Sequence, residues 1–197
     1  MRSEDRYRSY AELQKNEEEG IDFRVCMTDR TASAAVIAPH GGKIEPGTSE
    51  IAIAIAGGSY SLYSFEGLRP RPHQDLHITS TNFDEPRCLD LIATHNCVVS
   101  VHGLRGEHKA VDLGGLDIGL RDAACQKLKD AGFIAKIVTK GSHAALSERN
   151  ICNRGQWRIG VQLELTRGLR DAVLQDRTQL AAFAQAVRTA IADAADE

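Results

Sequence analysis

Short apolar segments rich in β-branched residues recur along the chain, and each is bounded by Gly, Pro or Asn. Segments of this length and composition predict β-strands. We expect strands at Phe23–Met27, Ala34–Ala38, Tyr60–Phe65, Leu76–Thr79, Cys97–Val101, Phe133–Val138 and Val161–Thr166. The strands are therefore spread over most of the chain, with room for helices between them.

Helical patterns occupy many of the intervals. We expect helices at Tyr7–Glu18, Glu50–Ala56, Pro86–Thr94 and Asp117–Ala131. A further helix closes the chain, because apolar residues recur there every three or four positions, at Leu180, Phe183, Ala184, Val187 and Ile191. Strands that alternate with helices predict an α/β fold, with an open mixed, largely parallel sheet between helices. Ligands of such sheets bind beyond the carboxyl ends of the strands.

Length and composition predict one compact domain over residues 1–197, since 42% of the residues are hydrophobic and 26% are charged. No stretch approaches the roughly 18 apolar residues of a membrane helix. The first twenty residues are too polar for a secretory signal. We therefore expect synthesis in the cytoplasm, no membrane contact, and release by lysis as the route to any extracellular substrate.

Cysteine content and charge narrow the function classes. The five cysteines are scattered and form no CxxC pair, which argues against a disulfide framework and a thiolate zinc site. The net charge is −3 and aromatic residues make up 5% of the chain, so the basic, aromatic-bearing surface typical of nucleic-acid binding is not expected. We expect a monomer that binds no nucleic acid.

Two histidines directly follow apolar strand segments. His40 lies in Pro39-His40-Gly41-Gly42, and His102 is followed by Gly103. Taken singly, each histidine is more often an ordinary hydrogen-bonded residue. Glu45, however, follows His40 closely and can turn back toward it, because the two glycines permit a tight turn. Two histidines and one carboxylate form a three-ligand set with an open fourth position, which is typical of catalytic zinc.

Such a site needs a general base, and Glu164 is the candidate. It interrupts the apolar segment Val161–Thr166. Side chains alternate along a strand, so Glu164 shares the polar face with Gln162. The alternative is an exposed polar position on an edge strand, which alternation also predicts.

Four segments, PHGGKIEPGTSEIA, LHITSTNFDEP, VSVHG and VQLELTRGLR, resemble in order and spacing the poly-gamma-glutamate hydrolase family of bacteriophages and bacilli. The resemblance covers nearly the whole chain. It implies a zinc carboxypeptidase-like fold and cleavage of the γ-amide bonds of an anionic glutamate polymer. It also implies one zinc ion per chain on His40, Glu45 and His102, with Glu164 as the base. The spacing HxxxxE differs from the HxxE of zinc carboxypeptidases, which leaves Glu50 as a rival of Glu45.

Cations are expected to select this substrate, because every γ-linked residue keeps a free α-carboxylate. Asn153 and Arg154 resemble the carboxylate-binding Asn-Arg pair of zinc carboxypeptidases, although here they follow His102 rather than precede it. Arg105 is the second choice, as a carboxylate reader or as an oxyanion donor. His77 is expected to line the cleft and to bind substrate or orient a ligand. For each residue the alternative is a solvated or hydrogen-bonded side chain without a role in binding.

Two rival functions remain open on the sequence. One keeps the zinc chemistry but acts on small N-acyl amino acids or on α-linked peptides. The other is a non-enzymatic phage replication accessory protein that binds nucleic acid, for which the charge and aromatic content give no support.

Overall fold

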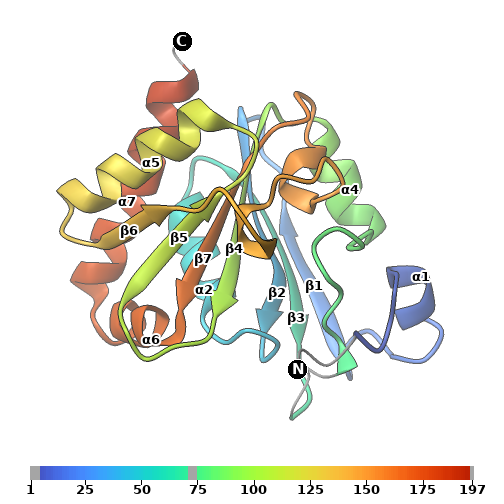
Figure 1. The fold of residues 1–197 in the computed structure, drawn as a ribbon. Coiled ribbons are helices and arrows are strands. Elements are labelled where there is room, and N and C mark those ends of the chain that lie inside the picture. Colours follow the sequence, from blue (N-terminus) through green and yellow to red (C-terminus); the bar gives the residue numbers. More distant parts are fainter. Residues whose placement is uncertain (1–4, 71–74, 196–197) are drawn as a thin grey trace.

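The computed structural model describes residues 5–70 and 75–195, and its centre is a single sheet (Figure 1). Within these residues the sheet has seven strands in the order β1-β3-β2-β4-β7-β5-β6. Neighbours β3, β2, β4 and β7 run parallel, whereas β1 and the β5–β6 pair run antiparallel to the strands beside them. The bounds are β1 Phe23–Thr28, β2 Ala34–Gly42, β3 Ser61–Gly67, β4 Cys97–Leu104, β5 Ala110–Gly114, β6 Ile134–Ile137 and β7 Val161–Thr166. The predicted open, mixed and largely parallel sheet is confirmed.

Helices cover both faces of the sheet and enclose two apolar cores. One core packs α2, α5, α6 and α7 against one face, and the other packs α1, α4 and a 3-10 turn against the opposite face (Figure 1). The bounds are α1 Tyr10–Leu13, α2 Thr48–Ala56, α4 Pro86–Ala93, α5 Ile118–Asp130, α6 Arg167–Gln175 and α7 Arg177–Ala195, with 3-10 turns at Ser142–Ala144 and Ile151–Arg154. This three-layer arrangement leaves the carboxyl ends of the parallel strands accessible at one edge.

One predicted strand, Leu76–Thr79, is wrong, because this segment is irregular. Its backbone groups bind side chains instead of a neighbouring strand: the Ile78 carbonyl oxygen lies 2.8 Å from His40 Nε2, and the Thr79 amide donates to Asp5 at 2.6 Å. Conversely, strand β5 was not expected. Its five residues are all buried, and it pairs antiparallel with β7, so the polar Asp112 sits within a covered strand.

Two helices also differ from expectation. The helix expected at Tyr7–Glu18 is limited to α1, because the chain turns after it and Glu17 accepts a hydrogen bond from the Tyr7 hydroxyl at 2.6 Å. Helix α6 was missed. It begins directly after β7, where the Thr166 hydroxyl caps it by accepting from the Leu169 amide at 3.3 Å.

An irregularity in β2 determines where His40 points. The register against β3 shifts between Ala38 and Gly41, so β2 contains one extra residue. Before this bulge Val36 and Ala38 face the α2 core. Strict alternation would send His40 to the same core, but an extra residue reverses the sides that follow it. His40 therefore faces the opposite side of the sheet, together with His102 of β4.

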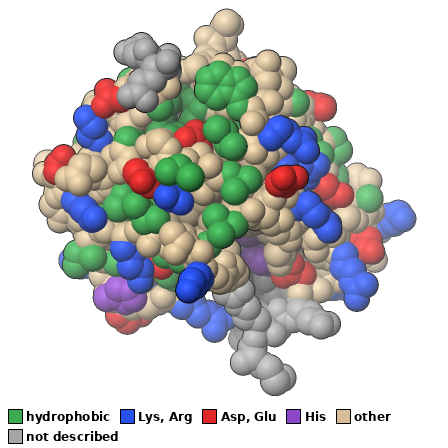
Figure 2. Space-filling view, turned by 45° about the horizontal axis from the view of Figure 1, so that its top comes forward, with side chains coloured by type: hydrophobic (Ala, Val, Ile, Leu, Met, Phe, Trp, Pro, Cys, Tyr) green, Lys and Arg blue, Asp and Glu red, His purple; other side chains and the backbone are tan. Residues whose placement is uncertain are grey.

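The exposed surface mixes charged and hydrophobic side chains, and the cysteines form no disulfides among the described residues. Figure 2 shows hydrophobic side chains in small groups between charged ones, with Lys and Arg spread over both sides of this face. All five cysteines are free thiols. Among the described residues, none of the helices has the length and apolar character needed to cross a membrane.

Candidate metal centre

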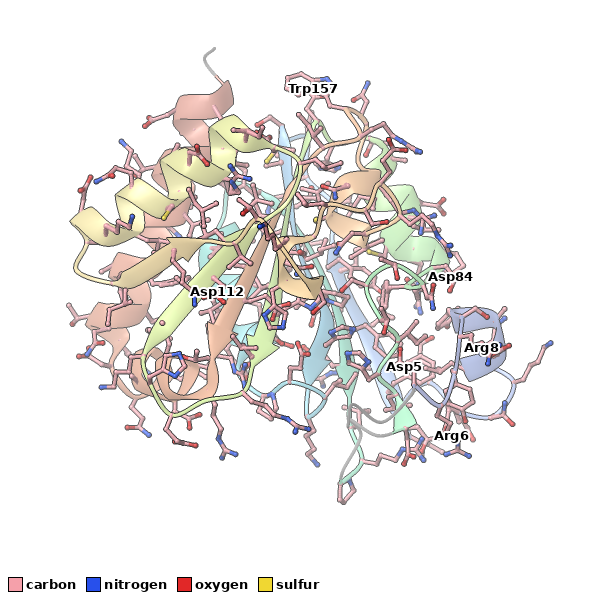
Figure 3. All side chains as sticks on the ribbon, viewed as in Figure 1. Asp5, Arg6, Arg8, Asp84, Asp112 and Trp157 are labelled. Atoms are coloured by element: carbon pink, nitrogen blue, oxygen red, sulfur yellow. The ribbon has the colours of Figure 1, made fainter. Side chains whose placement is uncertain are left out.

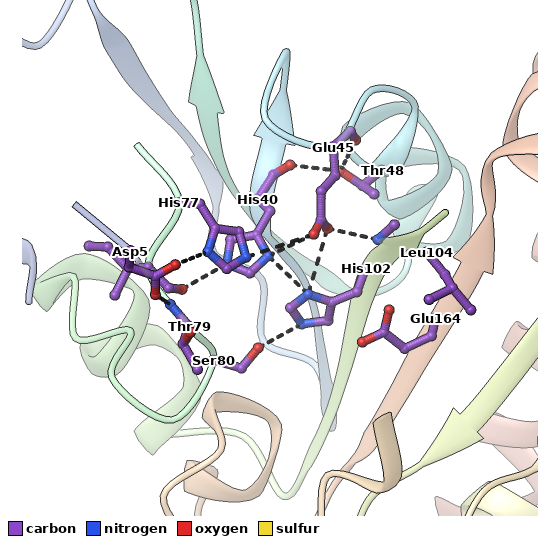
Figure 4. A network of polar contacts seen from close by, with 12 residues as sticks. Asp5, His40, Glu45, Thr48, His77, Thr79, Ser80, His102, Leu104 and Glu164 are labelled. Carbon is purple, nitrogen blue, oxygen red and sulfur yellow. Dashed lines mark hydrogen bonds and ion pairs between the residues drawn. The ribbon is translucent and has the colours of Figure 1, made fainter. Parts of the chain in front are cut away.

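The three predicted ligands meet at the carboxyl ends of β2 and β4 (Figure 4). His102 Nδ1 lies 3.1 Å from His40 Nδ1. One Glu45 carboxylate oxygen lies 3.4 Å from His40 Nδ1, and the other lies 3.8 Å from His102 Nδ1. All three side chains are buried. The fold thus brings two strand-end histidines and one carboxylate into contact.

These separations fit a single small cation. Zinc bound tetrahedrally at about 2.0–2.1 Å holds its ligand atoms roughly 3.3 Å apart. The tautomer of His40 also fits the role of a metal ligand. His40 Nε2 lies 2.8 Å from the Ile78 carbonyl oxygen, which can only accept, so Nε2 carries a proton and Nδ1 is the ligand atom.

Glu45 is held in place by the backbone around it. The Gly103 amide donates to its Oε2 at 2.7 Å. The Thr48 hydroxyl, at the start of α2, donates to the Glu45 carbonyl at 2.9 Å. Glu50 lies in the first turn of α2 and is exposed, so the structure places Glu45, rather than Glu50, in the cluster.

The three groups shift one another's pKa values. Burial opposes charge on His40, but the adjacent Glu45 carboxylate outweighs it and raises the pKa of His40. Burial likewise opposes charge on Glu45, yet His40 lowers the pKa of Glu45 to about 2. Burial and then His40 lower the pKa of His102 to about 3. A proton on His40 Nδ1 therefore faces the Glu45 carboxylate and His102 Nδ1. A metal cation would bind in the same place, between these three groups.

A third histidine, His77, borders the cluster, and Asp5 orients it. His77 Nδ1 lies 2.7 Å from the Asp5 carboxylate, and the ring centroids of His77 and His40 are 4.0 Å apart. His77 Nε2 reaches Glu45 at 4.0 Å, so His40, Glu45 and His77 form an alternative three-ligand group. Asp5 was not expected here (Figure 3). Its distance of 72 residues from His77 along the chain leaves no local signal.

Glu164 lies beside the cluster on β7. It pairs in register with His102 on the adjacent strand, and both side chains occupy the face opposite Leu163 and Leu165. The Gln162 amide donates to Glu164 Oε1 at 3.0 Å. Asn150 in turn donates to Gln162 at 3.0 Å, and both amides are buried. A buried chain of amides thus fixes the carboxylate.

The other predicted residues lie outside this cluster. Arg105 is exposed just beyond β4. Arg154 is half-buried and donates to the Phe83 carbonyl oxygen at 3.1 Å. Asn153 is fully buried, and its amide donates to the carbonyls of Ala145 and Ser147 at 2.7 and 2.9 Å. The geometry therefore favours a structural role for Asn153.

Close packing beneath Glu45 explains why position 103 is glycine. A Cβ there would lie 2.1 Å from Arg170 Nη1 and 2.9 Å from Glu45 Cβ. Arg170 is itself buried and donates to the Leu165 carbonyl at 2.8 Å. Its guanidinium has little room to move aside.

We expect Gly103→Ala to destabilise the protein by about 1–3 kcal/mol, because the added methyl overpacks this contact. Urea unfolding of the metal-free protein measures the effect. Gly58→Ala is the matched control, since a Cβ at Gly58 meets no heavy atom within 4 Å. Equal stability of the two variants would show that Arg170 and Glu45 shift without cost.

An open α/β sheet with two histidines and a carboxylate at the ends of neighbouring parallel strands is the arrangement typical of metallohydrolases. A more specific assignment follows from sequence. The family model described as poly-gamma-glutamate hydrolase matches residues 7–190, and the chain belongs to this family.

Two solved structures and one curated relative are similar to this chain. The chain is 30% identical to a bacteriophage poly-gamma-glutamate hydrolase, with a TM-score of 0.91 over 98% of this chain and 99% of that one. It is 34% identical to a zinc-free apo form of YndL, with a TM-score of 0.89 over 97% and 99%. The SPbeta prophage-derived protein YoqZ of Bacillus subtilis (strain 168) is 40% identical over 82% of this chain. The match spans only 59% of YoqZ itself.

Proposed function

We propose that this protein hydrolyses the γ-glutamyl amide bonds of poly-γ-glutamate, with one zinc ion on His40, Glu45 and His102 and with Glu164 as general base. The observation that carries the proposal is the convergence of two Nδ1 atoms and one carboxylate at separations of 3.1, 3.4 and 3.8 Å. Family membership and the similarity to the bacteriophage hydrolase support the substrate. The zinc-free form of YndL supports the choice of metal.

Zinc suits this set of donors. Calcium and magnesium prefer sites built from oxygen, whereas imidazole nitrogens favour zinc and related transition metals. When bound, zinc at such a site lowers the pKa of a water molecule and polarises a carbonyl oxygen. His102 is favoured over His77 as the third ligand, because its Nδ1 lies 3.1 Å from His40 Nδ1 and 3.8 Å from a Glu45 oxygen, whereas His77 Nε2 lies 4.0 Å from Glu45.

The protein's own groups then handle the protons. Glu164 accepts a proton from the attacking water and delivers it to the leaving amine nitrogen. The Gln162 amide holds the carboxylate in one orientation through Oε1. Arg105, exposed at the end of β4, is the proposed partner for a substrate α-carboxylate next to the scissile bond.

Incubating the zinc-loaded protein with poly-γ-glutamate and with α-linked polyglutamate, followed by sizing of the products, tests the function. We expect the γ-linked polymer to be shortened and the α-linked polymer to remain intact. Cleavage of the α-linked polymer alone would make the protein a peptidase on the same scaffold. Stoichiometric zinc without cleavage of either polymer would point to small N-acyl amino acids.

Zinc affinity is expected to fall as the pH drops through the raised pKa of His40. Below that pKa the metal must displace a proton from His40, whereas Glu45 and His102, with pKa values of about 2 and 3, need to release none. One displaced proton weakens binding by up to about tenfold per pH unit. Titration against a competing chelator from about pH 8 to about pH 5.5 covers the ordinary histidine range. A flat profile would show that His40 carries no proton for zinc to displace.

A further inference from the structure

A cavity of about 470 Å³ lies outside the metal centre, and four arginines line it: Arg8, Arg149, Arg154 and Arg158. They come from segments far apart in the sequence, since Arg8 precedes α1 and the other three surround the 3-10 turn at Ile151–Arg154. Figure 3 places Arg8 and Asp84, another lining residue, on the side of α1 and α4. The volume falls within the range of ordinary ligand sites.

The arginines outnumber the acids of this cavity. Its two acidic lining residues are Asp84 and Glu148, and Asp84 already accepts a hydrogen bond from the Tyr10 amide at 2.5 Å. Several arginines outside the cavity are neutralised, as in the pair of Arg24 with Glu66 at 2.7 Å. Within residues 5–70 and 75–195, none of the four cavity arginines forms a salt bridge. The cavity therefore offers unneutralised guanidinium groups to an anion.

One segment, residues 80–83, borders both this cavity and the metal centre. The Ser80 hydroxyl lies 3.5 Å from His102 Nε2, while the next residues, Thr81 and Asn82, line the cavity. The Phe83 ring lies 6.4 Å from the His40 ring, and its carbonyl oxygen binds Arg154 on the cavity side. A chain held at the metal centre reaches the cavity by crossing this short segment.

Arg158 has an unusual backbone at the edge of the cavity. Its φ is +62°, in the left-handed region that non-glycine residues rarely adopt. A turn closed by the Arg158 amide and the Gly155 carbonyl at 3.0 Å holds it there. Such conformations cost energy and are found at binding sites more often than elsewhere. The fold thus keeps an arginine, rather than a glycine, at a position that glycine would fit better.

We propose that the arginine cavity is a remote subsite that binds α-carboxylates of the poly-γ-glutamate chain several residues from the scissile bond. The proposal rests on the proposed function and deepens it. A γ-linked polymer carries one carboxylate per residue, so a chain with one residue at the metal centre presents further carboxylates to Arg149, Arg154 and Arg158. Single-stranded nucleic acid fits less well, because none of the residues lining the cavity is aromatic, and aromatic side chains supply the main stacking surface for bases.

The double variant Arg149→Gln/Arg158→Gln tests the subsite with two substrates. One is long poly-γ-glutamate, and the other is a γ-linked glutamate dimer too short to leave the metal centre. We expect KM for the polymer to rise about tenfold or more, with kcat unchanged, and kcat/KM for the dimer to stay within about twofold of wild type. The polymer KM of the wild type should also rise with salt more steeply than that of the variant. Arg177→Gln, at the exposed start of α7, is the matched control.

Arg158→Gly separates loss of binding from loss of folding. Glycine accepts the left-handed backbone, so this variant should unfold at a temperature no lower than wild type while its polymer KM still rises. A polymer KM that matches the Arg177→Gln control, or a parallel loss on polymer and dimer, overturns the subsite. An oligonucleotide that binds wild type but not the double variant, with polymer KM unchanged, also overturns it. If wild type cleaves neither substrate, the proposed function itself fails and the subsite with it.

Discussion

Replacing Glu164 with glutamine is expected to abolish turnover of poly-γ-glutamate while leaving zinc bound. Glutamine keeps the size of the side chain and can still bind Gln162, but it cannot accept the proton of the attacking water. Loss of a general base costs about 10²–10⁴-fold in rate. The measurement is kcat on the γ-linked polymer, together with the zinc content of the purified variant.

Glu50→Gln is the control for this experiment. Glu50 is exposed on α2, away from the cluster, and its variant should keep both zinc and activity. Near-normal turnover by Glu164→Gln would remove Glu164 from the reaction. Loss of zinc in the Glu164 variant would instead make this carboxylate part of the metal site.

Removal of a ligand histidine is expected to give the second large effect. His40→Ala and His102→Ala should lower zinc affinity by more than the roughly 10–100-fold that follows loss of a residue which only orients a ligand. His77→Ala should fall within that smaller range, since His77 borders the cluster through ring contact with His40 and reaches Glu45 only at 4.0 Å. Competition with a chelator measures each affinity.

The contrast between His77 and His102 decides the ligand set. If His77→Ala loses zinc completely and His102→Ala keeps it, the third ligand is His77, and His102 becomes a neighbour of the site. His108→Gln serves as a control, because His108 is exposed. Thermal unfolding of each variant separates loss of the site from loss of the fold.

The parts of the site that the sequence could predict are those with a local signature. His40 and His102 each follow an apolar segment and lie near the carboxyl end of a buried strand, so the position of the strand end fixes the position of the histidine. Glu164 follows from alternation along β7. Glu45 follows from its short distance to His40 and from the turn between them. In each case the information lies within a few neighbouring residues.

The parts that could not be predicted depend on contacts between distant segments. Asp5 reaches His77 across 72 residues, and the buried chain from Asn150 through Gln162 to Glu164 crosses from a 3-10 turn to a strand. The segment Leu76–Thr79 has the composition of a strand, yet its polar backbone groups bind side chains of the site. A composition pattern cannot distinguish these two uses of an apolar segment.

The extra residue in β2 makes chain length part of the metal centre. Without this bulge, regular pairing of the same residues would let the pleat of the strand carry the imidazole through the sheet into the packing of Val36 and α2. Substitutions in this segment alter one side chain at a time, whereas loss of the bulge would turn a ligand away from the site without changing its identity. We therefore expect relatives that share this chemistry to keep the spacing of this segment more strictly than its composition.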